Sequence, residues 1–128
     1  MRKSPSSPLP SPYAAAVDPT AVEKAAEQVL SADDAGRLTS LLSLLADPVR
    51  VRILDALESV GELCVGDLAL ALGVNEDATS YALRLLRTAG LVQSRKVGRT
   101  VVYRLADQFP EPLLAHCLRE LITLSRAV

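Results

Sequence analysis

Aromatic residues are scarce in this 128-residue sequence, which has three tyrosines, one phenylalanine and no tryptophan. Hydrophobic residues nevertheless make up 49% of the chain, so a buried core must consist mainly of leucine, valine, alanine and isoleucine. Such side chains favour helices packed on helices, and the length suits one domain. We therefore expect a mainly helical protein with little β-structure.

Long apolar runs are also missing, because no window approaches the ~20 apolar residues of a membrane-spanning helix. Arg2 and Lys3 are followed by serine and proline rather than by the apolar stretch of a secretory signal. We expect a cytoplasmic protein without a membrane partner. Its two cysteines, Cys64 and Cys117, are then reduced thiols.

The residue sets that carry catalysis are absent as well. The sequence contains a single histidine, and it shows no Ser/His/Asp set, no glycine-rich phosphate loop and no complete metal site. We therefore do not expect an enzyme.

The formal charge of −1 is distributed unevenly along the chain. The segment from Asp18 to Leu72 has 4 basic and 10 acidic residues, whereas Gly73 to Arg104 has 6 basic and 2 acidic residues. A basic block in an acidic chain is typical of a protein that binds a polyanion. The alternative is an ordinary solvated face.

Proline and serine dominate the N-terminus, and we expect residues 1–17 to form a disordered tail ahead of one domain over residues 18–128. Apolar residues then recur at helical spacing near 20–30 and 38–45, which predicts two amphipathic helices. Asp47 and Pro48 suit the N-cap and first turn of a third helix.

A helix-turn-helix is predicted next. Residues 65–72 form a short helical pattern that Gly73 interrupts. Asn75 suits the N-cap of a second helix, which extends to about Ala89, before the helix-ending Gly90. Two short helices around a glycine-containing turn, the second rich in polar and basic residues, are typical of a DNA-reading motif.

The hydrophobic period changes from 3.6 to 2 after this motif. Residues 91–96 and 99–105 are rich in β-forming side chains, and Val97–Gly98 lies between them. This pattern predicts a β-hairpin. A hairpin directly after a recognition helix is a wing, so the expected fold is a mainly α winged helix-turn-helix with a small β-hairpin.

A last helix is predicted over residues 110–127. Its apolar stripe is broad for a terminal surface helix, and the helix near residues 20–30 is similarly apolar. Two such helices flanking a small domain imply burial against a second copy of the chain. We therefore expect a homodimer through the first and last helices.

Four stretches in order make the chain resemble the ArsR/SmtB family of metal-responsive repressors: Leu45–Leu57, Glu62–Val74, Thr79–Val92 and Gly98–Asp107. The resemblance implies four helices, a hairpin and a fifth helix in each subunit of a homodimer. It also implies binding to double-stranded operator DNA and release by an inducer. The implied function is a transcriptional repressor whose inducer is a metal ion, such as the divalent ion zinc.

The predicted recognition helix departs from the family's commonest form, because Tyr81 and Ala82 stand where Ser-His-His or Ser-His-Gln continues after Ser80. The operator is therefore expected to differ from the commonest one. Our candidates for base or near-base contacts are Asn75, Thr79, Ser80, Tyr81 and Arg84. Our candidates for phosphate contacts, at the tip of the wing, are Arg95, Lys96 and Arg99.

Two partial metal sites follow from the resemblance. Cys64 and Asp67 match two ligands of the SmtB-type zinc sensors, but the second cysteine of the arsenic and cadmium sensors is replaced by Gly66. A helix N-terminus lowers the pKa of a thiol. One Cys and one Asp still do not complete a tetrahedral site, and Cys64 as a small core residue is the alternative.

The second partial site lies around the last helix. Asp107 matches the aspartate of the family's Asp-x-His ligand pair, but Phe109 replaces the histidine. Glu120 is a substituted ligand position, and His116 shares a helix face with it at i, i+4 spacing. The candidate metal ligands are therefore Cys64, Asp67, Asp107, His116 and Glu120, and a structural role for His116 is the alternative.

Two other functions are alternatives at this point. One is a regulator of the same fold that senses redox state or persulfide through cysteine, which requires the two thiols to approach each other. The other is a protein-interaction module that has lost DNA binding.

Overall fold

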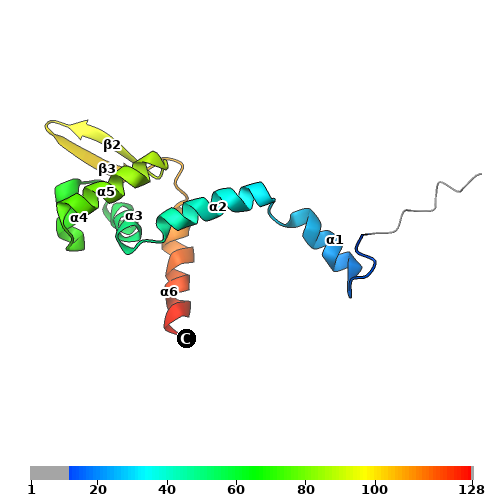
Figure 1. Cartoon of the computed structure of the whole chain (residues 1–128). Coiled ribbons are helices and arrows are strands. Elements are labelled where there is room, and N and C mark those ends of the chain that lie inside the picture. The colour runs from blue at the N-terminus through cyan, green and yellow to red at the C-terminus, as the bar shows by residue number, and fades with distance from the viewer. Residues whose placement is uncertain (1–11, 128) are drawn as a thin grey trace, which may run out of the picture. The chain divides into compact units, whose positions relative to one another are not determined.

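The computed structural model describes residues 12–127 (Figure 1). Most of the predicted tail, residues 1–11, lies outside the described residues, and residues 12–17 form turns and bends. The chain divides into two units, residues 1–37 and residues 38–128. In the first unit, helix α1 (Pro19–Gln28) begins at Asp18, whose carboxylate accepts a hydrogen bond from the Ala21 amide at 3.1 Å. No residue of α1 is buried.

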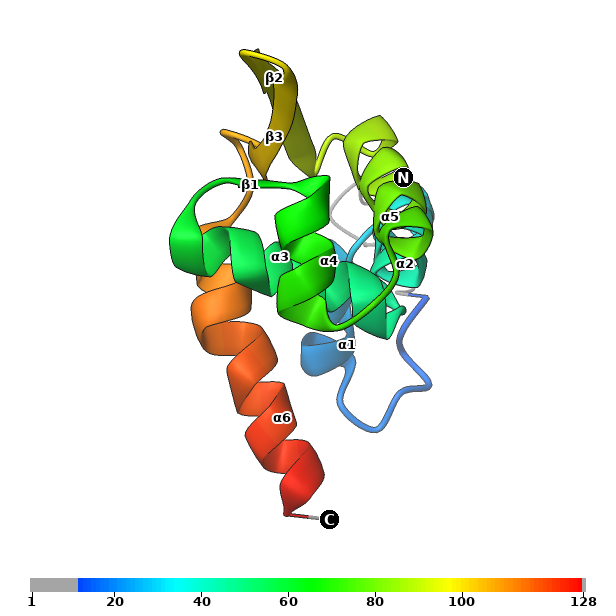
Figure 2. The same cartoon turned by 90° about the vertical axis from the view of Figure 1, so that its left-hand side faces the viewer.

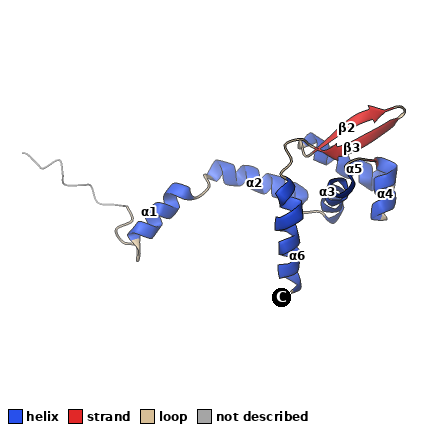
Figure 3. Ribbon diagram, turned by 180° about the vertical axis from the view of Figure 1, so that it is seen from behind, coloured by secondary structure: helices blue, strands red, loops and turns tan. Residues whose placement is uncertain are grey.

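Helix α2 (Ala32–Leu45) crosses the boundary between the units. The remaining elements of the second unit follow in chain order: α3 (Pro48–Val60), β1 (Leu63–Cys64), α4 (Val65–Leu72), α5 (Glu76–Thr88), β2 (Val92–Val97), β3 (Thr100–Leu105), the π-helical η1 (Leu113–Leu118) and α6 (Arg119–Arg126). The strands form one antiparallel sheet in the order β1-β3-β2. The hairpin of β2 and β3 extends beyond the helices, as Figures 2 and 3 show from two sides.

Capping explains where the central helices begin. Asp47 accepts a hydrogen bond from the Arg50 amide at 3.0 Å, and Pro48 occupies the first turn of α3. Asn75 accepts one from the Ala78 amide at 2.7 Å at the start of α5. Both predicted caps are confirmed, since each side chain satisfies an amide that has no partner within its helix.

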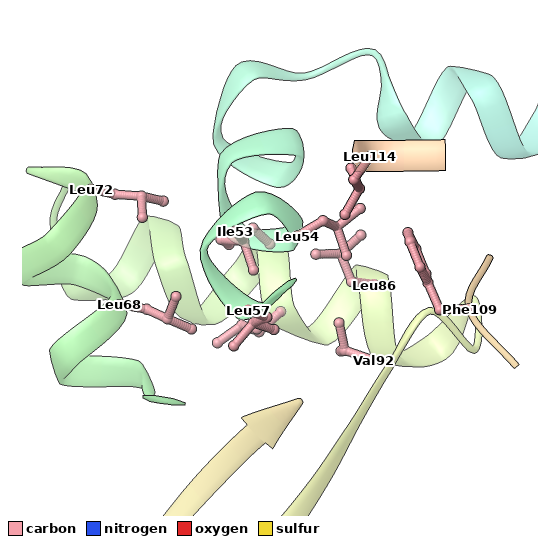
Figure 4. Close-up of a cluster of buried hydrophobic side chains, with 11 residues drawn as sticks. Ile53, Leu54, Leu57, Leu68, Leu72, Leu86, Val92, Phe109 and Leu114 are labelled. Carbon is pink, nitrogen blue, oxygen red and sulfur yellow. The ribbon is translucent and has the colours of Figure 1, made fainter. Parts of the chain in front are cut away.

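The core lies where α3, α4 and α5 meet. It is lined by apolar side chains from all three helices and from the segments that follow them, and its fully or nearly fully buried members include Ile53, Leu54, Leu57, Leu68, Leu83, Leu86 and Val92. Phe109, in the loop before η1, and Leu114, near the start of η1, also line it (Figure 4). The predicted leucine-rich helical core is confirmed, and it holds α5 and the hairpin in fixed positions.

Three local features differ from expectation. The predicted hairpin has a third strand, β1, whose two residues pair with Tyr103 and Val102. The turn consists of Gly98 and Arg99, one residue later than predicted, because Val97 pairs with Thr100. Gly98 has a φ of +63°, as the first residue of a type II′ turn requires. The last helix starts with a π-helical segment instead of continuous α-helix.

No helix in residues 12–127 is both long enough and apolar enough to cross a membrane.

Candidate nucleic-acid interface

The helix-turn-helix consists of α4 and α5. Gly73 ends α4 in the left-handed region, with a φ of +70°, which glycine adopts without steric cost. Its amide donates to the carbonyls of Ala69 and Leu70. The chain then turns within three residues into α5, whose inner side is buried through Ala82, Leu83 and Leu86. The opposite side of α5 faces solvent.

The exposed side of α5 carries three of the predicted base contacts. Ser80, Tyr81 and Arg84 are all exposed, and Tyr81 is 53% exposed despite its aromatic ring. The guanidinium of Arg84 lies over the Tyr81 ring, 5.7 Å from its centroid. Asn75 is exposed, but its side chain is engaged in the cap.

Thr79 is placed differently from the other predicted contacts. It is fully buried, and its hydroxyl donates to the Asn75 carbonyl at 3.0 Å. A side chain on the core side of α5 does not reach a DNA base, so Thr79 packs and stabilises the first turn of the helix.

The basic residues of the wing differ in whether they form an ion pair. Lys96 and Arg99 are exposed near the turn, and the ion pairs among residues 12–127 involve neither of them. Arg95 instead donates from Nε and Nη2 to the two carboxylate oxygens of Glu62, at 2.8 and 2.7 Å. This hydrogen-bonded guanidinium holds the pKa of Glu62 below its ordinary value, and the carboxylate raises the pKa of Arg95.

The sequence interpretation missed Glu62. Its contact with Arg95 spans 33 positions. The contact depends on strand β1, which has only two residues, lying beside β3. A carboxylate directly before β-forming residues was the only available signal.

The candidate metal ligands do not come together within the described part of one chain. No group of three or more His, Cys, Asp or Glu side chains there is arranged to hold a metal ion. Cys64 is a partly buried free thiol at the start of α4, and Asp67 is exposed in the first turn of that helix. Within residues 12–127 of a single chain, the candidate ligands therefore form no complete metal site.

The second group of candidate ligands likewise brings no three side chains together among the described residues. Asp107 accepts a hydrogen bond from Nη1 of Arg104 at 2.8 Å. His116 and Glu120 are exposed on η1 and α6. His116 borders a hollow of about 370 Å³ together with Glu58 and Glu111, two carboxylates that the sequence interpretation did not single out.

A helix-turn-helix followed by a β-hairpin, packed on a third helix, defines a winged helix-turn-helix protein. Residues 47–94 match the family described as bacterial regulatory protein, arsR family. The chain is 48% identical over 86 residues to a transcriptional repressor SmtB homologue of Synechocystis, covering 67% of this chain and 64% of that protein. It is 42% identical over 85 residues to the HTH-type transcriptional regulator NmtR of Mycobacterium tuberculosis, covering 66% and 70%.

A solved structure supports the same assignment. The antimony-specific transcriptional repressor AntR superposes with a TM-score of 0.63 at 30% identity, covering 78% of this chain and 86% of that one. The chain belongs to the arsR family of bacterial regulatory proteins, as the resemblance of its motifs predicted. This is a family of transcriptional regulators and not of enzymes. The chain spans just under two thirds of the length of the Synechocystis relative.

Proposed function

We propose that this protein is a transcriptional repressor that binds double-stranded operator DNA as a homodimer and leaves it when an inducer binds. One observation carries the proposal. The exposed side of α5 and the turn of the wing hold basic side chains that have no acidic partner among residues 12–127, namely Arg84, Lys96 and Arg99. Unpaired cations on a recognition helix and its wing are what a DNA phosphate and base surface requires.

The proposed contacts divide into two groups. Asn75, Ser80, Tyr81 and Arg84 at α5 would face the bases or the nearby backbone, whereas Lys96 and Arg99 would contact phosphates from the wing. Arg95 is the weaker member of the second group, because Nε and Nη2 already donate to Glu62 and that carboxylate offsets its charge.

Exposed apolar side chains support the homodimer. In α6, Leu121, Ile122 and Leu124 are 57%, 45% and 62% exposed, and α1 buries none of its residues. Apolar surface of this kind is covered in a stable protein, and a second copy of the chain is the partner we propose. Ile122→Glu is expected to shift the dimer toward monomer in sedimentation, whereas the exposed Leu70→Glu in α4 leaves the dimer intact.

We propose a metal ion as the inducer, in keeping with the metal-responsive family that the motifs resemble. Because the described residues of one chain bring no three candidate ligands together, such a site would draw on both subunits. The residues we propose to test are Cys64, Asp67, Asp107, His116 and Glu120. Redox sensing through Cys64 and Cys117 is the second candidate, since both are free thiols and Cys117 is exposed.

The test is binding of the full chain to DNA from its own promoter region. We expect binding at low salt, and release when zinc or another divalent ion is added. If DNA binding persists with every metal but is lost on oxidation, the protein senses redox state and not a metal ion. If the chain does not bind at low salt, the proposal is wrong and a protein-interaction role takes its place. Release by metal that is unchanged in both Cys64→Ser and His116→Ala would exclude those two residues as ligands.

A further inference from the structure

The contact between Tyr81 and Arg84 stands out on the exposed side of α5. The two residues are one turn apart at i, i+3 spacing, which places them on the same helix face. The Arg84 guanidinium lies 5.7 Å from the Tyr81 ring centroid, and both side chains are exposed. None of the ion pairs in residues 12–127 includes Arg84, so the ring is the partner that orients it.

A cation–π contact with a ring leaves a guanidinium without a carboxylate partner, so its N–H donors are not committed to an ion pair. The N–H donors of arginine point outward in the plane of the group, in a fixed fork. An arginine held beside a ring in this way has fewer orientations and can still present two parallel donors to a ligand. An arginine paired with a carboxylate, as Arg95 is with Glu62, has already committed two donors and has its charge offset.

The position of the pair on α5 favours a base over a phosphate. Ala82, Leu83 and Leu86 mark the buried side of the helix, and Tyr81 and Arg84 lie on the opposite side. When a recognition helix enters the major groove, this outermost line of residues faces the base edges. The neighbouring Ser80 offers a single short hydroxyl, so Arg84 is the group on this line that can form two donor bonds at once.

We propose that Arg84 reads a guanine in each operator half-site through bonds to O6 and N7, and that Tyr81 is a positioning residue that holds the guanidinium by its ring. Guanine is the base whose major-groove edge offers two adjacent acceptors. The proposal rests on the proposed function, because it requires operator binding. It adds a specificity-determining pair and the base that the pair selects.

The experiment begins with selection of binding sites from randomised duplexes by the full wild-type chain. Each base pair of the selected site is then replaced, and affinities are measured for wild type, Arg84→Ala, Tyr81→Phe and Tyr81→Ala. We expect one guanine per half-site whose replacement weakens wild-type binding roughly tenfold or more. Arg84→Ala should lose discrimination at that position and keep it elsewhere. Tyr81→Phe retains the ring and should retain the discrimination at that guanine, whereas Tyr81→Ala should lose part of it.

Arg87→Ala is the matched control, because it removes another exposed arginine from the same helix. The Nη1 group of Arg87 donates to the Ser94 hydroxyl at 3.2 Å instead of lying over a ring. It should leave the guanine preference unchanged. Equal loss of affinity for all sequences in Arg84→Ala, with a smaller salt dependence, would make Arg84 a phosphate contact and overturn the proposal. Loss of discrimination in Tyr81→Phe would overturn the role of the ring. A wild-type chain that selects no DNA would overturn the proposed function itself.

Discussion

Arg95 on strand β2 donates hydrogen bonds from Nε and Nη2 to the two carboxylate oxygens of Glu62, at 2.8 and 2.7 Å. Glu62 lies directly before β1, which pairs Cys64 with Val102 of β3, and Val102 pairs in turn with Arg95. The wing is therefore joined to the start of the helix-turn-helix by a salt bridge as well as by the sheet. The same contact removes one positive charge from the set available to DNA.

Replacing Glu62 should release that charge. In Glu62→Gln, Arg95 is expected to become available to phosphate, so affinity for any duplex rises severalfold and the salt dependence becomes steeper by up to about one counterion. Fluorescence anisotropy over a salt series measures both quantities. The matched control is Glu58→Gln, which removes the same charge from α3 without an ion pair to Arg95.

The Arg95→Ala variant tests whether Arg95 already contacts DNA in the wild-type protein. If Arg95→Ala in the wild-type background lowers the salt dependence by about one counterion, Arg95 already contacts phosphate and the pairing with Glu62 is not maintained on DNA.

The pH dependence follows from the same pair. Hydrogen bonding to Arg95 lowers the pKa of Glu62 in the folded protein. A lowered pKa stabilises the fold above the unfolded-state pKa, and this contribution is lost as the pH falls through the folded-state value. Carboxyl NMR titration should give a depressed pKa for Glu62 that returns toward its ordinary value in Arg95→Ala. An identical pKa in the two proteins would mean that the salt bridge does not form in solution.

The helical core gives a prediction about stability. Leu57 is 1% exposed in the C-terminal half of α3, so Leu57→Ala should lower the free energy of unfolding by about 2–5 kcal/mol. Leu70→Ala on α4 is the control, because Leu70 is 82% exposed and its truncation should change stability by less than about 0.5 kcal/mol. Denaturant unfolding followed by circular dichroism measures both. Equal losses in the two variants would contradict the assigned core.

The sequence predicted the elements whose signals are local. Asp47 and Asn75 cap helices through contacts three residues away, and Gly73 ends α4 through its own backbone geometry. Predicting these three features therefore requires no knowledge of the fold. The leucine-rich core was expected from composition, and Leu54 and Leu83 are among the residues that form it.

The remaining features depend on residues distant in sequence. Strand β1 is too short to show a period of two, and it is defined only by its pairing with β3. The Glu62–Arg95 contact follows from that pairing. Thr79 is polar and adjacent to exposed residues in sequence, yet helical geometry turns it into the core. The metal ligands were inferred from matching positions, and positions alone do not show whether side chains meet.

The central claim is that α5 and the wing bind DNA through unpaired basic side chains, and the salt dependence of binding tests it most directly. Affinity of the full chain for its promoter DNA is measured from about 50 to 200 mM salt, with wild type beside Lys96→Ala/Arg99→Ala. We predict a steep loss of wild-type affinity with salt, and a slope smaller by about two counterions in the double variant. A wild-type affinity that does not change with salt, or a double variant with the wild-type slope, would contradict the account.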